Sequence, residues 1–211
     1  MYSPTHFKQH DTEAMFELIR EFPLATLVIR TAKGIAVNHI PMLLSTGSGD
    51  DIRLSGHIPR SNPVWRDHVA GSMAIAVFHG PQAYITPSWY ASKKQHGRVV
   101  PTWNYTTVHA HGHPAFMHDD RWLMSHLDQL TKQLESSFDH PWAVSDAPSD
   151  FTDKLITHLV GIEIPVRELV GKWKVSQNRP AEDRAGVAEG LKSDRDSGRQ
   201  LMSDLVAGDE G

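Results

Sequence analysis

The sequence predicts an α+β protein that is mainly β, with an antiparallel barrel as its central feature. Short β-rich runs follow one another over residues 24–86 with tight turns between them. Such spacing favours an antiparallel barrel over a doubly wound sheet. Stretches with helical spacing stand before these strands and again after residue 120, so helices and strands are segregated rather than alternating.

The first elements follow from apolar spacing and proline positions. Thr12–Phe22 carries apolar residues on one helical face, and Pro23 ends the helix. Leu24–Arg30 and Ile35–Ser45 are predicted strands joined by a turn at Lys33-Gly34. Pro41 lies inside the second strand, which indicates an edge, a bulge or a break that faces a ligand.

The middle of the chain continues this pattern of strands and turns. Residues 47–51 form a predicted hairpin loop, and a short helix is expected from Pro63 to Val69. The predicted strands are Ile52–Ile58, Ser72–His79 and Gln82–Thr86, with a turn at Gly80-Pro81 between the last two.

The second half is predicted to contain an excursion loop, two strands, two capped helices and a charged tail. The loop covers residues 87–98, and the strands are Val99–Met117 and Ile162–Val166; the helices are Arg121–Glu135, capped by Asp119 or Asp120, and Phe151–Val160. From Pro180 the chain is charged, and its weakly amphipathic helices need a partner surface. We therefore expect one domain over residues 1–179 and a helical tail over 180–211.

Composition excludes several classes of protein. The 211 residues include no cysteine, which rules out disulfides, thiolate zinc sites and cysteine nucleophiles and fits a reducing cytoplasm. The sequence shows neither an apolar run of membrane-spanning length nor a secretory signal, so we expect a cytoplasmic protein without membrane contact. The net charge of −4 argues against bulk affinity for DNA.

The strongest local motif lies between Leu54 and Arg66, where a strand, a loop and a helix start meet. Asn62 precedes Pro63 at the predicted helix start, where unpaired backbone N–H groups attract anions. Arg60 adds a planar donor fork that suits phosphate, and Gly56 permits close approach of a ligand. An ordinary capped helix with a solvated arginine is the alternative interpretation.

Two further segments are candidates for holding a flat ring. In Asn38-His39-Ile40-Pro41, the interrupted strand frees backbone groups to bond the edge of a heterocycle, although an edge bulge is the simpler interpretation. In 101–105, alternation places Trp103 and Tyr105 on one face, where they wall a ring system or contribute to a core or a dimer contact.

Histidines and cations supply the remaining candidates. His109, His111 and His113 share a strand face in a geometry compatible with zinc or iron, or are surface histidines. Basic residues gather at 93–98 and 172–184, where a solvated surface is the simpler interpretation. Motifs typical of serine hydrolases, P-loop proteins and metalloproteases do not occur.

Several segments together resemble the PaiB-type FMN-binding negative transcriptional regulators. The matching stretches are MYSPTHF, HIPMLL, LSGHIPRSNPVW, VFHGPQAYITPSWYASK, VVPTWNYTTVHAHG and LVGIEIPVRELVGKWKVSQNR, which cover nearly the whole chain in order. This family is related to the pyridoxamine-phosphate-oxidase-like split barrels. The resemblance implies a six-stranded antiparallel split barrel with flanking helices, and a homodimer that holds FMN at the subunit interface.

The resemblance also implies which residues bind the cofactor. His39, Ile40 and Pro41 would lie along the isoalloxazine ring. The turn from Gly56 and His57 to Asn62 would hold the phosphate through Arg60, Ser61 and Asn62, while Trp103 and Lys174 would approach from later elements of either subunit.

Three functions stay open at this point. The first is a flavin-binding repressor of transcription, with FMN or its redox state as the signal and DNA as a partner, although the sequence shows no helix-turn-helix. The second is a small flavin-dependent oxidoreductase. The third is a metal or haem protein that uses the three histidines.

Overall fold

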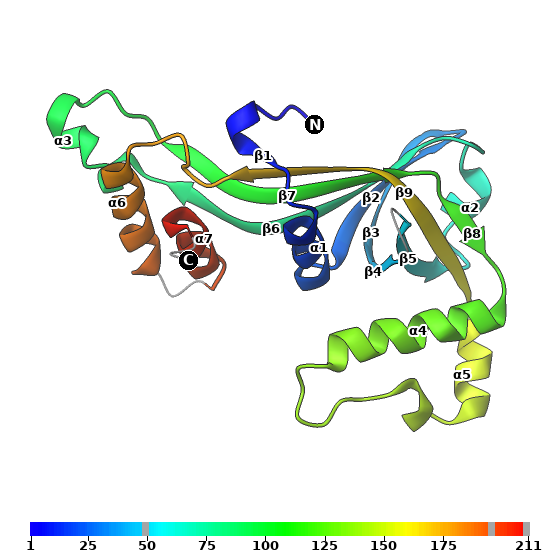
Figure 1. Ribbon diagram of the computed structural model, residues 1–211. Helices are drawn as coiled ribbons and strands as arrows, with labels where there is room; N and C mark the ends of the chain where they lie inside the picture. Colours follow the sequence, from blue (N-terminus) through cyan, green and yellow to red (C-terminus); the bar gives the residue numbers. More distant parts are fainter. Residues whose placement is uncertain (48–50, 194–196, 209–211) are drawn as a thin grey trace. The chain divides into compact units, whose positions relative to one another are not determined.

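A computed structural model of the chain describes residues 1–47, 51–193 and 197–208 (Figure 1). The strands of these residues are β1 (Lys8–Gln9), β2 (Leu24–Thr31), β3 (Gly34–Pro41), β4 (Leu43–Thr46), β5 (Ile52–Pro59), β6 (Ala74–Ile85), β7 (Thr102–Gly112), β8 (Ala115–Met117) and β9 (Leu159–Lys174). The α-helices are α1 (Thr12–Glu21), α2 (Val64–Asp67), α3 (Ser92–His96), α4 (Asp120–Glu135), α5 (Ser149–Ile156), α6 (Ala181–Lys192) and α7 (Ser197–Ala207). Short 3-10 helices are η1 (Thr5–Phe7), η2 (Pro87–Trp89) and η3 (Val144–Asp146).

The predicted class is confirmed, because the chain is mainly antiparallel sheet with flanking helices. The strand order is β3-β2-β6-β7-β9-β5-β4, and β1 and β8 also pair with β9. The predicted number of six strands is wrong, since the described residues form nine. β9 runs for 16 residues; it pairs with both β5 and β8 in its first half and with β1 near its C-terminal end.

The chain divides into two compact units, which are described separately. Unit 1 comprises Met1–Glu21, His79–Val108 and Val170–Gly211, and unit 2 comprises Phe22–Phe78 and His109–Leu169. The long strands β6, β7 and β9 each contribute residues to both units.

Unit 2 packs its sheet against α4. Leu54, Ile58 and Ile162 are fully or almost fully buried in its core. Asp119 caps α4 by accepting a hydrogen bond from Trp122 N at 2.8 Å, as the sequence predicted. A Cβ at position 161 would lie 2.2 Å from Trp122 Cζ3, so the glycine is what lets α4 lie close to β9.

Unit 1 has its core between the sheet and the two C-terminal helices. The cluster contains Ala83, Ile85, Tyr90, Val175, Val187, Ala188, Leu191, Met202 and Val206. The tail helices thus have the partner surface that their pattern requires. The division into 1–179 and 180–211 stays a prediction.

Two glycines predicted at element boundaries lie inside strands. The expected turn at Gly80-Pro81 is wrong, because β6 continues through it. A Cβ at position 80 would lie 2.3 Å from Thr106 Oγ1 and 2.9 Å from Leu18 Cδ1, so this glycine serves packing. Gly161 likewise lies inside β9, and the preceding helix ends at Ile156 rather than at residue 160.

Other boundaries differ by smaller amounts. The helix expected from Pro63 to Val69 is the single turn α2, and the expected loop at 87–98 contains η2 and α3. Of the hairpin loop predicted at 47–51, residues 48–50 lie outside the described part. Among the described residues, no helix combines the length and apolarity required to cross a bilayer.

Candidate functional site

The edge strand β3 exposes two of the predicted site residues on the outer face of unit 2. β3 is the first strand in the sheet order, so of the edge, bulge or break that Pro41 indicated, the edge is present. The predicted strand Ile35–Ser45 is also interrupted after Pro41, where β3 ends and β4 begins at Leu43. His39 and Pro41 are exposed and alternate with buried or half-buried neighbours. His39 Nδ1 lies 3.2 Å from Thr26 Oγ1 on β2, which orients the imidazole along this face.

Ile40 and Gly56, in contrast, belong to the interior of unit 2. The side chain of Ile40 is 3% exposed. A Cβ at position 56 would lie 3.1 Å from Ile40 Cγ2 and 3.2 Å from Pro41 O. The glycine is therefore explained by the close approach of β3 and β5. Any contact of these two residues with a cofactor would involve backbone atoms, and it stays a prediction.

Arg60 follows β5 and binds two backbone carbonyls. Its Nε donates to Thr157 O at 2.7 Å and its Nη2 to Leu159 O at 2.8 Å. Nη1 lies 3.5 Å from His118 Nδ1. A guanidinium carries five N–H donors, so these bonds leave donors of Nη1 and Nη2 for a further acceptor. Arg60 thus fastens β5 to the start of β9 and retains capacity to bind an anion.

The residues after Arg60 connect the turn to the edge of β3. Asn62 Nδ2 donates to Asn38 Oδ1 at 2.7 Å, and Asn62 Oδ1 accepts from Val64 N at 3.1 Å. Ser61 is exposed beside them. The helix α2 has only four residues, and its first N–H group, that of Val64, already donates to Asn62 Oδ1. An anion bound here would therefore rely on the side chains of the turn rather than on the helix start.

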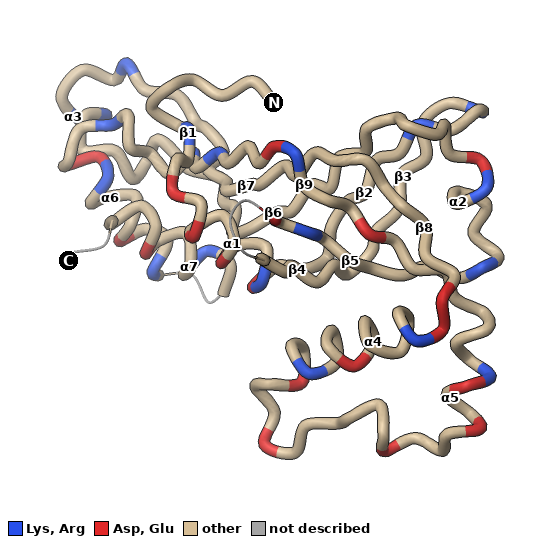
Figure 2. Tube along the Cα trace, turned by 45° about the vertical axis from the view of Figure 1, so that its right-hand side comes forward, with Lys and Arg blue, Asp and Glu red and all other residues tan. Residues whose placement is uncertain are grey.

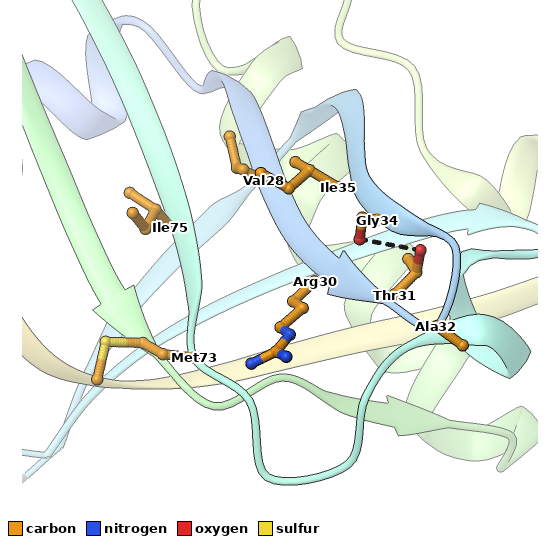
Figure 3. Close-up of a pocket in the computed structure, with 8 residues that line it drawn as sticks. All are labelled: Val28, Arg30, Thr31, Ala32, Gly34, Ile35, Met73 and Ile75. Atoms are coloured by element: carbon orange, nitrogen blue, oxygen red, sulfur yellow. Dashed lines mark hydrogen bonds between the residues drawn. The ribbon is translucent and has the colours of Figure 1, made fainter.

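Two hollows adjoin these residues in unit 2. One, of about 310 Å³, lies beside the edge of β3 and includes Asn38, Asn62 and the ion pair between Lys33 and Asp67. The other, of about 520 Å³, lies on the outer face of β2, β3 and β6. Figure 3 shows its lining, which is Val28, Arg30, Thr31, Ala32, Gly34, Ile35, Met73 and Ile75. Both volumes suit a small-molecule ligand.

His57 takes part in a hydrogen-bond chain that the sequence did not reveal. Its Nδ1 lies 3.2 Å from His126 Nε2, and His126 Nδ1 lies 3.2 Å from Ser55 Oγ. Trp122 stacks on His126 with an interplanar angle of 15°. Burial lowers the pKa of His57. The pKa of His126 is lowered to about 4, mainly by burial and secondly by the charge of His57. The position of His126 between Leu123 and Leu130 was the available signal, because all three share one helical face.

Trp103 and Lys174 belong to unit 1. Trp103 is 50% exposed, and its Nε1 donates to Gln82 Oε1 at 3.1 Å. Lys174 donates from Nζ to Trp103 O at 2.6 Å and to Thr102 Oγ1. The structure therefore brings these two predicted residues together within unit 1.

The three clustered histidines do not converge in the described residues. The rings of His109 and His111 have centroids 6.3 Å apart and are tilted by 41°. His113 follows the end of β7. Within residues 1–47, 51–193 and 197–208, no group of three or more histidine or carboxylate side chains has the arrangement of a metal site.

Comparison with known proteins decides the family. The sequence model of the family described as "Putative FMN-binding domain" matches residues 1–168. The chain belongs to this family. Protease synthase and sporulation protein PAI 2 of Bacillus subtilis is 28% identical over 206 residues, which cover 98% of this chain and 96% of that protein. An uncharacterized protein of Emericella nidulans is 32% identical over 212 residues, covering 84% of each chain.

Solved structures support the fold of this FMN-binding family. The FAD and haem binding protein of Mycobacterium smegmatis aligns with a TM-score of 0.59 at 16% identity, over 87% of this chain and 80% of that one. The flavocytochrome Anf3 of Azotobacter vinelandii aligns with a TM-score of 0.58 at 13% identity, over 85% and 75%. The comparisons confirm the predicted resemblance, the split-barrel class and FMN as the cofactor of the family.

Proposed function

We propose that the protein is an FMN-binding transcriptional regulator that acts as a homodimer with FMN at the subunit interface. The observation that carries the proposal is the family match over residues 1–168 together with the full-length similarity to PAI 2 of Bacillus subtilis. The name of that relative, which refers to protease synthesis and sporulation, supports a regulatory role. DNA as the partner and a cytoplasmic location stay predictions.

The side chains of unit 2 fit the chemistry of a flavin phosphate. Arg60 keeps unused guanidinium donors, Ser61 is exposed, and the amide of Asn62 lies beside the edge of β3. In our proposal these three groups bind the phosphate, while His39 and Pro41 lie along the ring. FMN, when bound, supplies the redox-active ring, and the chain binds and orients it.

The outer face of unit 2 supports a second copy of the chain as the partner. Leu24, Ile35, Val37 and Met73 expose 59%, 75%, 56% and 49% of their surface. In the register of β2 with β3, Leu24 lies opposite Pro41 and Val28 lies opposite Val37. An apolar sheet face next to a hollow of about 520 Å³ is typical of an interaction site. A dimer through this face would bury the apolar residues beside His39 and Pro41.

The experiment that tests the proposal is an absorbance spectrum of the protein after FMN is added, followed by gel filtration. We expect the flavin band to elute with the protein at the volume of a dimer. An elution without flavin, after incubation with saturating FMN, would remove the proposal. A salt-dependent shift of a specific DNA fragment is expected of the regulator. Turnover of NAD(P)H with bleaching of the flavin would instead select the oxidoreductase that the sequence left open.

Arg60 provides a test at the level of one side chain. Arg60→Ala should weaken FMN by roughly 1.5–3 kcal/mol if a charge-assisted bond to the phosphate is lost. Riboflavin, which lacks the phosphate, should bind almost unchanged. Both affinities are measured by quenching of flavin fluorescence. Arg66→Ala is the matched control, because Arg66 is exposed on the neighbouring α2 and its guanidinium lies 4.8 Å above the ring of Trp65. Equal losses for both flavins would make Arg60 purely structural.

A further inference from the structure

Unit 2 exposes large apolar side chains at the far end of α4 and on α5. Leu130 of α4 is buried at 6% exposure, whereas Leu134, one turn further along the helix, is 44% exposed. The apolar stripe that packs on the sheet therefore continues beyond the end of the core. On α5, Ile156 is buried, but Phe151 and Leu155 expose 53% and 47% of their surface. These two side chains share a helical face, because they are four residues apart.

The loop between the two helices adds two exposed aromatic side chains. Phe138 is 61% exposed, and Trp142 is 48% exposed. Figures 1 and 2 both show this loop running back beside α4 to α5, and both η3 and α5 contact α4. We call residues 134–155, all of which belong to unit 2, the α4–α5 arm. Clustered exposure of large apolar side chains on a folded surface is typical of a site of protein association.

Hydrogen bonds fix the backbone of the loop in this arm. Glu135 accepts two of them, from Trp142 N to its Oε2 at 3.0 Å and from Phe138 N to its backbone carbonyl at 3.0 Å. Asp146 Oδ2 accepts a third from Ala143 N at 2.9 Å. The two aromatic side chains therefore project from an ordered backbone. A preorganised aromatic surface loses less conformational entropy when a partner binds.

The α4–α5 arm is strongly acidic. Its charged residues are Glu135, Asp139, Asp146, Asp150, Asp153 and Lys154. Five acidic side chains against one lysine give a net charge of −4, which equals that of the whole chain, so the rest of the chain is neutral overall. Figure 2 shows acidic positions along the loop and α5. Asp139, Asp150 and Asp153 are exposed and take part in none of the ion pairs of the described chain. The arm therefore presents unpaired carboxylates together with apolar side chains.

We propose that the α4–α5 arm docks a basic amphipathic helix of another protein. The apolar face of that helix packs on Phe138, Trp142 and Phe151, and its Lys and Arg side chains lie beside the carboxylates. Aromatic residues are enriched in the cores of protein interfaces, and complementary charges at the rim select the partner. An amphipathic helix supplies both chemistries on one short segment.

The charge of the chain favours this partner over a second copy of the protein. Outside the arm, the chain has no net positive charge to offer to the carboxylates. The negative charge of the arm also disfavours nucleic acid, which is bound through its phosphates. The inference goes beyond the proposed flavin function, because no residue of the arm is among those proposed to bind FMN or to form the homodimer.

The test uses a fluorescently labelled peptide about five helical turns long, with leucine on one face and lysine on the other. Binding to the wild-type protein is measured by fluorescence anisotropy. We expect the peptide to bind and the affinity to fall as the salt concentration rises, because salt screens exposed charges. A peptide with glutamate in place of each lysine, and one with serine in place of each leucine, should both fail to bind.

Two variants locate the peptide on the arm. Trp142→Ala should weaken binding about tenfold or more, because an exposed tryptophan at the centre of an interface carries much of the binding energy. Asp150→Asn combined with Asp153→Asn should weaken binding about fivefold at low ionic strength and have little effect at high salt. The three side chains are exposed, so circular dichroism and the melting temperature should match those of the wild type.

Matched controls come from exposed residues outside the arm. Tyr84→Ala removes an aromatic side chain that is 46% exposed in unit 1. Glu17→Gln combined with Glu168→Gln removes two exposed carboxylates, one on α1 and one on β9. Neither control should change the affinity for the leucine and lysine peptide.

Three outcomes would overturn the inference. The first is that the wild type does not bind the leucine and lysine peptide, or binds the glutamate peptide equally well. The second is that the arm variants bind the peptide as tightly as the controls do. The third is a shift of Trp142→Ala from the dimer to the monomer volume in gel filtration, which would make a second copy the occupant of the arm. Flavin binding is not a readout here, so a failure of the wild type to bind FMN would leave this test unaffected.

Discussion

Lowering the pH from 6.5 to 4 should cost the protein roughly 3 kcal/mol of folding free energy through His126 alone. The side chain is 3% exposed, and its pKa is lowered from an ordinary value of 6.5 to about 4, by burial first and by His57 second. Between these values the unfolded chain binds a proton that the folded chain does not. The contribution is therefore complete above pH 6.5 and is lost progressively as the pH falls toward 4.

The measurement is urea unfolding at a series of pH values from 7.5 to 4. The pKa of His57 is also lowered by burial. Its contribution to folding stability is therefore also lost as the pH falls. His126→Gln should flatten the dependence of stability on pH, because the titrating group is gone. His140→Gln changes an exposed histidine of the same unit and should leave the dependence as it is in the wild type. If the His126 variant kept the wild-type dependence, His126 would be titrating normally in the folded protein.

The sequence was sufficient to predict elements that depend on local periodicity and local caps. The helix ending at Glu135 was located from its leucines, and Asp119 caps it as expected. Pro41 indicated an edge, a bulge or a break; β3 is an edge strand, and it ends at Pro41. These features depend on residues within a few positions of one another, so a single sequence contains the information that specifies them.

Features that depend on distant partners could not be predicted in this way. Gly80 and Gly161 are typical boundary residues, yet each lies inside a strand because Leu18 or Trp122 occupies the space of its missing side chain. From the sequence, Arg60 is either a phosphate ligand or a solvated arginine, but Thr157 O and Leu159 O, about a hundred positions away, accept hydrogen bonds from two of its nitrogens. The chain from Ser55 through His126 to His57 joins β5 with α4, and neither element indicates the other.

The candidate site was predicted mainly through resemblance to a family. Spacing drew attention to His39, Arg60 and Trp103, but it left an edge bulge, a solvated arginine and a core or dimer aromatic as the simpler explanations. The structure narrows these choices by exposing His39 and Trp103 and by burying Ile40. Exposure of a polar or aromatic side chain on an otherwise ordered face is the physical signal that periodicity alone does not supply.

Deleting residues 180–211 should prevent unit 1 from folding, although the family match ends at residue 168. Val187, Leu191, Met202 and Val206 are 0–2% exposed and form one cluster with Ala83 and Ile85 of the sheet. At roughly 1.5–3 kcal/mol for each buried side chain, the four together contribute roughly 6–12 kcal/mol as an upper estimate. That is comparable with the whole stability of a domain, about 5–15 kcal/mol. We expect the truncated chain to be insoluble or to lack a cooperative melting transition.

A single substitution tests the same packing without removing the tail. Leu191→Ala should destabilise the protein by roughly 2–5 kcal/mol, because a fully buried leucine leaves a cavity. Leu201→Ala, at a position that is 39% exposed in the following helix, should cost far less. Urea unfolding of both variants gives the comparison. A large loss of folding stability confined to Leu191→Ala would mean that the tail belongs to the core of unit 1. Small and similar losses of stability in both variants, together with cooperative melting of the truncated chain, would mean that residues 1–179 fold alone.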